Sequence, residues 1–424
     1  MRYSKLKSSW DALQIVAPPP CLSLHPSPET PLQNEWTPDL EHWIRQHALH
    51  VGFDATAIAR VASPDAAQPT LDATRFADWV EAGRAGEMDY LKRRDDQGIL
   101  LRSEVQIALP WARSVIVCAI NYNADAPHSI DPAAPSTGWI ARYAWSGKPS
   151  APSSEEDPTT LLPTDYHDEL LRRLRLLESH LTTRIPCQTR CYVDTGPLVE
   201  RTAAARAGLG WIGKNACLID HQLGSWLLLA VIVTSLPVAA GVTLQPAADR
   251  CGSCTRCLDA CPTNALIAPR QMDASLCISY LTIEKKRSIP TELRAPIGRQ
   301  IFGCDICQDV CPWNRRAPIA AQDNMTPRPE LINPSLESLA ALDNPAFKRL
   351  FKGSPLERTG KKRFHRNIAI AMGNSGDRQF LPRLRFWQTA DDPILAETAT
   401  WAIDRILNHT NPSAAQEEPH NTLC

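Results

Sequence analysis

The stretch Cys251-Gly-Ser-Cys-Thr-Arg-Cys-Leu-Asp-Ala-Cys-Pro262 has the spacing C-x2-C-x2-C-x3-C-P. Two-residue spacers allow three thiolates to bind three corners of one iron–sulfur cubane, while the fourth cysteine ligates a second cluster. The proline then ends the ligand loop, because its ring fixes φ. Zinc also binds C-x2-C pairs, but a triple run that ends in Cys-Pro is poor zinc spacing. The stretch therefore predicts two 4Fe–4S clusters and a redox protein.

A second run, Cys304-Asp-Ile-Cys-Gln-Asp-Val-Cys-Pro312, lacks one two-residue step and needs one more thiolate. Cys277 lies between the two runs and is assigned that role. In ferredoxin-like modules the last cysteine of a run ligates the other cluster. The predicted ligands of the first cluster are Cys251, Cys254, Cys257 and Cys311, and those of the second are Cys261, Cys277, Cys304 and Cys307.

Chain length, cysteine count and net charge limit the class of protein. The chain has 424 residues, 14 cysteines and a formal net charge of −1. The length predicts two or three domains, and the charge excludes a globally basic nucleic-acid binder but not a local basic face. Pro18–Pro20 interrupt the N-terminal segment, so we expect no secretory signal and a cytoplasmic, reducing location. The longest apolar stretch, Trp226–Val242, contains Thr234, Ser235 and Pro237, which favours a buried strand and a loop over a membrane span.

Composition and periodicity divide the chain into segments of a multi-domain α+β protein. We predict a disordered extension over 1–36, an α/β domain over 37–240, a two-cluster ferredoxin-like domain over 241–320, an α-helical HEAT-like region over 321–410 and a tail over 411–424. Within the α/β domain, 146–163 is rich in Pro, Ser and acidic residues and is interpreted as an inserted surface loop.

Local patterns predict the main elements. Helices are expected at Leu40–His50, Asp165–Thr183 and Leu198–Ala207, the last with Pro197 in its first turn, and strands at Ser114–Ala119, Cys191–Val193 and Trp226–Thr234. Two C-terminal helices, Lys361–Gly373 and Pro393–Leu407, are about thirty residues apart, which is compatible with one HEAT-like repeat. A generic helical cap explains the same spacing almost as well.

Two motifs in the α/β domain match their templates incompletely. Gly208–Gly213 reads G-x-G-x-x-G, but it follows a helix, and Asn215 stands where a P-loop needs Ser or Thr after Lys214. These glycines are interpreted as a turn that brings backbone close to a bulky ligand. Asp165-Tyr-His167 begins the cobalamin motif D-x-H-x-x-G, but Leu170 replaces the Gly. Asp165 as a helix N-cap explains it, and so does a role for His167 in lining an active site.

Taken together, the chain resembles the epoxyqueuosine reductases. The resemblance covers roughly residues 37–407 and is carried by segments that start at Leu109 (LPWARSVIV), Arg142 (RYAW), Asp165 (DYH), Val193 (VDTGPL), Gly208 (GLGWIGKN), Cys251 (CGSCTRCLDACPTNAL), Cys277 (CISYLT) and Gly303 (GCDICQDVCPWN). The 146–163 insertion departs from the family pattern, and the helical C-terminal region is short. The resemblance implies reduction of epoxyqueuosine to queuosine at the wobble position of tRNA, by base-off cobalamin without a protein His ligand, fed by the two clusters.

The resemblance also implies site residues and partners. Cobalamin is expected at Arg102, Asp194, Lys214, Asn215, Leu218, Gly224 and Ser225. Asp194, which follows a predicted strand, is the expected proton donor, with Tyr166 and His167 as candidate pocket neighbours; an ordinary turn residue is the alternative. The expected partners are the tRNA anticodon stem-loop and a low-potential donor such as a flavodoxin or ferredoxin. The chain is expected to act as a monomer and without a membrane.

Two other functions fit the same clusters. One is an iron–sulfur electron carrier or activator, and the other is a cobalamin-dependent reductive dehalogenase-like enzyme. Bound cobalamin would distinguish the reductase from a carrier or activator, and dependence of the activity on tRNA would distinguish it from a dehalogenase-like enzyme. Because the net charge is near zero, tRNA must bind through local patches, for which the candidates are Lys285–Arg287, Arg315–Arg316 and Lys361–Arg363 with His365 and Arg366. Solvated surface accounts for each patch as well.

Overall fold

The computed structural model describes residues 35–62, 69–150, 161–239, 245–321 and 324–408. The predicted disorder at 1–34 and the predicted tail at 411–424 lie outside the described residues. Trp36, which we assigned to the extension, is fully buried, and its Nε1 donates to Ser114 Oγ at 2.7 Å. The predicted boundary at 36 is therefore wrong, because an indole buried at the sheet belongs to the core.

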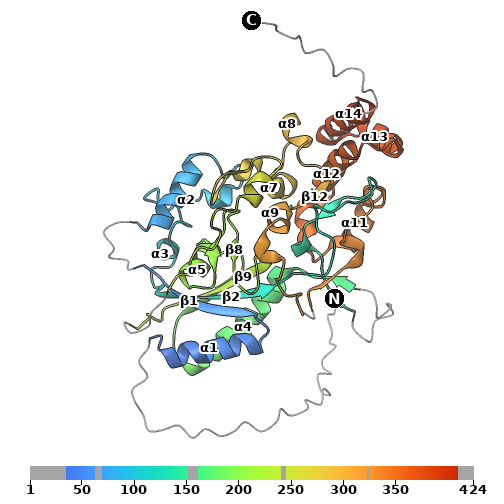
Figure 1. Ribbon diagram of the computed structural model, residues 1–424. Helices are drawn as coiled ribbons and strands as arrows, with labels where there is room; N and C mark the ends of the chain where they lie inside the picture. The colour runs from blue at the N-terminus through green and yellow to red at the C-terminus, as the bar shows by residue number, and fades with distance from the viewer. Residues whose placement is uncertain (1–34, 63–68, 151–160, 240–244, 322–323, 409–424) are drawn as a thin grey trace, which may run out of the picture. The chain divides into compact units, whose positions relative to one another are not determined.

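A four-stranded sheet forms the centre of the first region, in the order β1 (Ala55–Arg60), β2 (Ser114–Asn121), β9 (Leu227–Thr234), β6 (Thr189–Tyr192) (Figure 1). The predicted strands are thus confirmed, with small shifts at their ends. Every neighbouring pair is antiparallel. The mixed helix and strand composition is as expected, but the antiparallel sheet makes this region α+β rather than α/β.

Side-chain alternation along β2 builds a core on each face of the sheet. Ile116, Cys118 and Ile120 face the core shared with α1 (Pro38–His50) and α4 (Tyr166–Arg184). Val115, Val117 and Ala119 face the core shared with α5 (Glu200–Arg206). Figure 1 shows α1 and α4 on one side of the sheet and α5 on the other. Burial of each such branched side chain stabilises the fold by about 1.5–3 kcal/mol.

The predicted helices begin close to their expected caps. Asp165 caps α4 by accepting from His167 N at 3.0 Å, and the stripe Leu170, Leu174, Leu177, Leu181 is buried. Helix α5 begins later than predicted, with its N-cap at Val199, so Pro197 lies outside it. The remaining short elements of this region are α2 (Leu71–Glu81), η1 (Asp89–Leu91), α3 (Val105–Ala108), η2 (Arg142–Ala144), β7 (Trp211–Ile212) and β8 (Leu218–Ile219).

The predicted surface loop 146–163 is bounded by strands. β4 (Ser146–Pro149) pairs antiparallel with β5 (Leu161–Pro163) on one side and with β13 (Thr326–Pro327) on the other. Residues 151–160 lie outside the described residues. The loop assignment is therefore wrong at both ends of the segment, where backbone pairing outweighs the Pro- and Ser-rich composition.

Short elements position the cysteines between 250 and 314. They are α6 (Arg256–Asp259), β10 (Leu266–Ala268), β11 (Gln271–Met272), η3 (Ala274–Leu276), α7 (Ile278–Ile283), α8 (Thr291–Arg294), β12 (Gln300–Phe302), α9 (Ile306–Asp309) and η4 (Pro312–Asn314). α6 and α9, one from each cysteine run, contact each other, and β12 pairs parallel with β3 (Trp139–Ile140). The two runs therefore lie side by side and join the first region.

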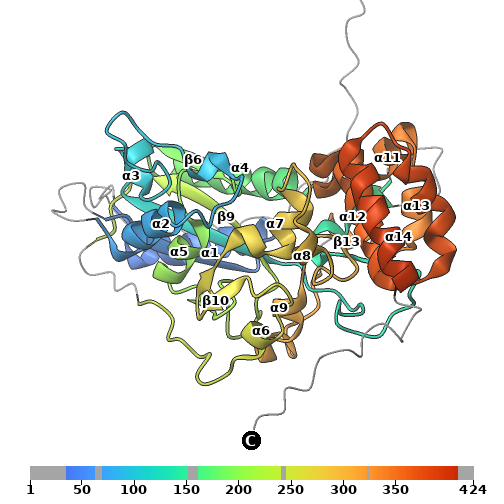
Figure 2. The ribbon, with the colours of Figure 1, turned by 90° about the horizontal axis from the view of Figure 1, so that it is seen from above.

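The C-terminal region is helical, with a phenylalanine-rich core. Figure 2 shows α11 (Asn344–Phe351), α12 (Gly360–Ser375), α13 (Leu381–Gln388) and α14 (Pro393–Asn408) packed together. The predicted helices at 361–373 and 393–407 are confirmed as α12 and α14. Shorter elements are η5 (Pro329–Leu331), α10 (Leu336–Ala340), η6 (Pro355–Thr359) and η7 (Arg378–Phe380). Among the described residues, no helix has the length and apolar character needed to cross a membrane.

Candidate functional site

Asp194 lies in the loop between β6 and α5 in a left-handed conformation, with φ +58°. Aspartate tolerates this region better than most residues other than glycine. Its backbone N–H donates to Glu200 Oε1 at 2.8 Å, and its carbonyl accepts from Arg102 Nη2 at 3.0 Å. The side chain is 53% exposed. The backbone is thus held on both sides while the carboxylate faces outward.

The first turn of α4 places two polar side chains on this carboxylate. The Tyr166 hydroxyl donates to Asp194 Oδ2, and His167 Nε2 lies 3.4 Å from the same oxygen. Burial, followed by the negative charge of Asp194, raises the pKa of Tyr166 well above its ordinary value. The hydroxyl therefore stays protonated at neutral pH and acts as a donor to the carboxylate. The first turn of α4 thus fixes the position of one oxygen of the Asp194 carboxylate.

An ion pair brings the C-terminal region to this site. Arg358, on η6, donates to Asp165, and its Nη2 is also 2.8 Å from His167 Nδ1. Asp165 Oδ1 lies 2.8 Å from that same nitrogen. Burial alone would raise the pKa of Asp165, but the bonds from His167 and Arg358 outweigh it and lower the pKa to about 2. Asp165 is thus negatively charged at neutral pH and fixes the orientation of the His167 ring.

Glu200 lies behind Asp194 and is buried. Burial, followed by the charge of Asp194, raises the pKa of Glu200 well above its ordinary value. A protonated Glu200 beside Asp194 avoids placing two carboxylate charges in contact. Sequence reasoning missed this pair, because a Glu in the first turn of a helix is favoured by the helix dipole alone.

The aromatic ring of Tyr143 connects this site with the second cysteine run. Tyr143 packs edge-to-face on Tyr166, with centroids 5.9 Å apart, and lies 6.0 Å from the Phe302 ring. The preceding residue, Arg142, donates its backbone N–H to Asp305 Oδ2 at 2.6 Å. Asp305 directly follows Cys304. Sequence reasoning missed Tyr143 as a site residue, although it lies in the quoted RYAW segment.

The eight predicted ligand cysteines gather in two sets. Burial, with the neighbouring thiols of Cys311 and Cys251, raises the pKa of Cys257 to about 11. The pKa of Cys311 is raised by burial and then by its neighbours Cys251, Cys217 and Cys254. The first set therefore combines three cysteines of the first run with the last cysteine of the second.

The second set combines the last cysteine of the first run and Cys277 with the first two cysteines of the second run. Burial raises the pKa of Cys304 well above its ordinary value, and the neighbouring Cys277 and Cys261 add to this. The pKa of Cys307 is also raised well above its ordinary value, by the neighbouring thiol of Cys217 and by burial, and Cys304 and Cys277 are further neighbours. Cys217 is a ninth thiol to which the sequence assigned no role. Within the described ranges, no three His, Cys, Asp or Glu side chains converge closely enough to hold a single metal ion. A cubane spreads its four ligands over separate corners, so this spacing does not oppose a cluster.

The residues predicted for cobalamin do not all lie in one place. Arg102 contacts Asp194, as described above. Lys214 donates to the Gly252 carbonyl at 2.7 Å, and Asn215 Nδ2 lies 3.4 Å from the Cys307 carbonyl. Ser225 N donates to Asn314 at 2.7 Å. The other two predicted residues, Leu218 and Gly224, are buried in the same stretch. Four of the seven therefore contact the cysteine-bearing segments rather than Asp194; these are Lys214, Asn215, Gly224 and Ser225.

The glycine run is required by packing within the chain rather than by a ligand. A Cβ at Gly210 would lie 2.3 Å from the Ile219 carbonyl, and one at Gly208 would lie 2.4 Å from the Gln245 carbonyl. The backbone therefore approaches its own chain, at β8 for Gly210 and at Gln245 for Gly208, and this packing accounts for both glycines.

The predicted tRNA patches differ in exposure. Arg366 is 1% exposed and donates to the Lys285 and Arg287 carbonyls, while Arg363 donates to the Ile283 carbonyl at 2.7 Å. His365 is also buried. These three are structural, so their assignment to a phosphate-binding patch is wrong. The exposed cations of the three patches are Lys286, Arg287, Arg315, Arg316 and Lys362.

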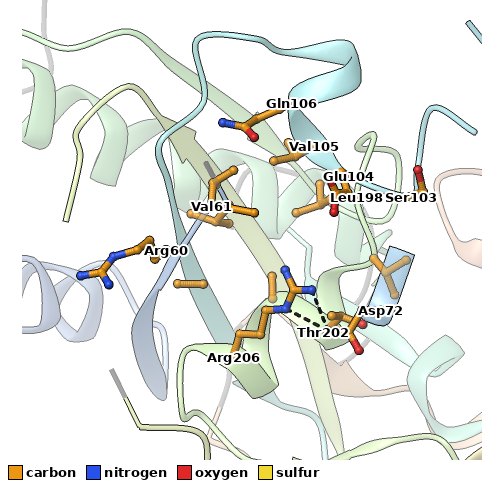
Figure 3. Close-up of a pocket in the computed structure, with 15 residues that line it drawn as sticks. Arg60, Val61, Asp72, Ser103, Glu104, Val105, Gln106, Leu198, Thr202 and Arg206 are labelled. Carbon is orange, nitrogen blue, oxygen red and sulfur yellow. Dashed lines mark hydrogen bonds and ion pairs between the residues drawn. The ribbon is translucent and has the colours of Figure 1, made fainter. Parts of the chain in front are cut away.

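A separate cavity of about 600 Å³, including space open to solvent, lies between β1, α3 and α5. Figure 3 shows Arg206 reaching across it to Asp72, at 2.7 Å. Arg206 also donates to Thr70 Oγ1, and Glu104 accepts from Thr70 N. The described lining includes none of the predicted site residues. Its polar groups bind one another, so it is not the candidate site.

Two family models match the chain. The model described as "4Fe-4S double cluster binding domain" matches residues 250–314, and the one described as "Epoxyqueuosine reductase QueG" matches residues 102–195. The first spans both cysteine runs, and the second spans Arg102 to Thr195 and includes Tyr143, Tyr166 and Asp194.

Curated relatives named epoxyqueuosine reductase match most of the chain. The protein of Xanthomonas campestris is 35% identical, covering 85% of this chain and 94% of its own length. That of Escherichia coli (strain K12) is 33% identical, covering 87% and 90%. That of Bacillus subtilis (strain 168) is 36% identical, covering 78% and 80%.

Solved structures with the same name share the fold. A crystal structure of epoxyqueuosine reductase with a tRNA-Tyr epoxyqueuosine-modified stem loop aligns with a TM-score of 0.73 and 32% identity, covering 87% of this chain and 90% of the other. The Streptococcus thermophilus structure aligns with a TM-score of 0.71 and 28% identity, covering 90% and 96%. A Bacillus subtilis structure has an aspartate-bearing catalytic loop swung out of the active site.

Proposed function

This chain belongs to the epoxyqueuosine reductase family, and we propose that it reduces epoxyqueuosine to queuosine at the wobble position of tRNA. The reaction removes the epoxide oxygen as water, with two electrons and two protons. The observation that carries the proposal is the placement of Asp194, Tyr166 and His167 next to Tyr143, whose ring leads to the second cysteine set. A proton donor and an electron source thus meet at one place.

The two cysteine sets fit two 4Fe–4S clusters, because each supplies four thiols in the crossed pattern of two-cluster modules. We assign the first cluster to Cys251, Cys254, Cys257 and Cys311, and the second to Cys261, Cys277, Cys304 and Cys307. The neighbour relations of Cys311 and Cys304 support this assignment.

Cobalamin is the third cofactor that we propose. Both nitrogens of His167 are engaged, by Asp165 and Asp194, which fits a cobalamin without a protein imidazole on its cobalt. We propose that Arg102, Asp194, Lys214, Asn215, Leu218, Gly224 and Ser225 hold it. When bound, cobalamin supplies the reducing metal centre that the side chains of this protein lack.

Asp194 is the proposed general acid. Cleavage of an epoxide C–O bond leaves negative charge on oxygen, which a positioned carboxylic acid can neutralise. Tyr166 and His167 fix the orientation of the Asp194 side chain, and Arg102 and Glu200 fix its backbone. Asp165 and Arg358 in turn fix His167. The donor is thus oriented from α4, α5 and the C-terminal region together.

The proposed reaction implies the partners of the protein, and its oligomeric state, location and domains are proposed with them. We propose the tRNA anticodon stem-loop as substrate carrier, a low-potential flavodoxin or ferredoxin as electron donor, a monomer, and a cytoplasmic location without a membrane. We also propose a first domain that includes Trp36 and ends at 240, and further domains at 241–320 and 321–410, the last HEAT-like.

The test is anaerobic reconstitution followed by turnover on tRNA carrying epoxyqueuosine, with cobalamin and iron measured on the same sample. The product expected is queuosine. A protein that binds clusters but no cobalamin would be an electron carrier or activator. One that turns over a halogenated substrate without tRNA would be dehalogenase-like.

A further inference from the structure

A groove of about 1370 Å³, including its open mouth, lies over the first cysteine set. Cys251, Cys254, Cys257 and Cys311 line it, beside Pro312 and Trp313. Four arginines also line it, namely Arg250, Arg256, Arg315 and Arg316, together with Lys214, which donates to the Gly252 carbonyl and which we propose for cobalamin. The groove therefore joins a strong positive charge to the thiols of the first set.

The arginines of this groove are available to a partner. Some other arginines at the surface bind carboxylates; Arg270 beside the groove binds Asp249, and Arg206 binds Asp72. Within the part of the chain that the structure describes, no carboxylate lies within ion-pair distance of Arg250, Arg256, Arg315 or Arg316.

Two acidic residues lie in an adjoining hollow, and both have other partners. Asp309 accepts from His128 and Ser129, and Asp259 accepts from the Thr255 hydroxyl at 2.8 Å. The cations that line the groove therefore outnumber the two carboxylates of the adjoining hollow, which Arg256 and Arg315 also line. The local field of this groove is positive although the net charge of the chain is −1.

The second cysteine set lies against a hydrophobic core. Cys277 and Cys304 pack against a core that contains Ile278, Leu281 and Ile370, and Tyr143 leads from Phe302 toward Asp194. The first set is thus the one that lines an open groove, and we expect electrons to enter there.

We propose that this groove docks an acidic, one-electron carrier protein that reduces the first cluster. The proposal rests on the proposed function, which needs two electrons for each epoxide. Two carrier molecules each lose one electron in successive encounters, and with two protons the epoxide oxygen leaves as water. Arginine-rich, small and short-lived contacts suit such encounters, because charge steers the carrier and rapid release is required.

The test measures cluster reduction in the reconstituted holoprotein, without tRNA, by stopped-flow absorption. Reduced flavodoxin is the protein donor and dithionite is the small-molecule donor. The variant is Arg250→Glu with Arg256→Glu, its iron content checked against wild type. The matched control is Lys348→Glu with Arg349→Glu, two exposed cations of α11.

At low salt, the rate constant for reduction by flavodoxin should fall at least tenfold in the groove variant and stay unchanged in the control. The difference should shrink as salt rises, while reduction by dithionite stays the same. Equal flavodoxin rates in wild type and variant at all salt concentrations would overturn the proposal.

Two further arms distinguish carrier docking from tRNA binding and from a loss of turnover. If Arg315→Glu with Arg316→Glu weakens tRNA binding and leaves the flavodoxin rate intact, the groove serves tRNA and the proposal is wrong. Turnover of tRNA driven by dithionite tests the proposed function independently, so its failure is distinguishable from a failure of docking.

Discussion

His167 Nε2 lies 3.4 Å from Asp194 Oδ2, the same oxygen that accepts the Tyr166 hydroxyl. One carboxylate oxygen thus has two partners from the first turn of α4, while the backbone of Asp194 is held by Arg102 and Glu200. The proposed proton transfer depends on this convergence, and its consequences are measurable.

Tyr166→Phe removes the hydroxyl but keeps the ring against Tyr143. A hydrogen bond to a charged group contributes about 1.5–3 kcal/mol, so turnover should fall about tenfold or more with tRNA affinity unchanged. If Tyr166 acts through Asp194, adding Tyr166→Phe to Asp194→Asn should cost nothing further. Additive losses in single-turnover rates would show that Tyr166 acts on the substrate independently.

Arg358→Ala should lower stability in a pH-dependent way. The folded pKa of Asp165 is about 2, below its ordinary value of about 3.9, so its ion-pair contribution is present above about pH 4 and lost as the pH falls toward about 2. Because Arg358 is half exposed, we expect a loss of only about 1 kcal/mol at pH 7. The urea unfolding free energies of wild type and variant should begin to approach each other below about pH 4 and converge only near pH 2, where Asp165 becomes protonated in the folded wild type. Arg349→Ala, an exposed control, should change nothing, and a difference that is constant with pH would contradict the assignment.

Cys277→Ala should remove one cluster and spare much of the other. Iron should fall from about eight to about four per chain after reconstitution, because Cys277 belongs to one set only. Cys187→Ala, which changes a half-buried cysteine outside both sets, is the control. Full iron content in the Cys277 variant would remove it from the ligands.

Lys361→Gln with Lys362→Gln should weaken tRNA binding and flatten its salt dependence. Lys362 is 84% exposed, and each lost phosphate contact lowers the slope of log K against log salt by about 0.7–0.9. Filter binding at several salt concentrations measures this, with Lys352→Gln as control. An unchanged slope would exclude this part of the helical region from the tRNA surface.

Much of the fold could be predicted because its signals are local. The stripe Leu170–Leu181 and the apolar run of β2 specify a helix and a buried strand by period alone. Trp36 and the ends of 146–163 could not be predicted in this way, because contacts between distant residues decide them. Trp36 donates a hydrogen bond to Ser114, and β4 pairs with Thr326–Pro327 on one side and with β5 on the other.

The same difference between local signals and tertiary contacts decides which site residues could be predicted. Cysteine spacing is local chemistry, so two sets of four could be proposed from the sequence. Arg358 and Asp165 are far apart in the chain and belong to no shared motif, and the pairing of Glu200 with Asp194 depends on a loop conformation. Basic runs were the weakest signal, because Arg363 and Arg366 donate to buried carbonyl oxygens instead of facing solvent.

The most direct test compares wild type with Asp194→Asn on tRNA carrying epoxyqueuosine, with dithionite as donor and nucleoside mass spectrometry as readout. Wild type should yield queuosine, which is lighter by one oxygen atom. The variant should retain iron, cobalamin and tRNA affinity, while its turnover falls about 10²–10⁴-fold, as expected for loss of a general acid. The proposed reaction would be contradicted if fully loaded wild type left epoxyqueuosine unchanged, and the role of Asp194 if Asp194→Asn turned over as fast as wild type.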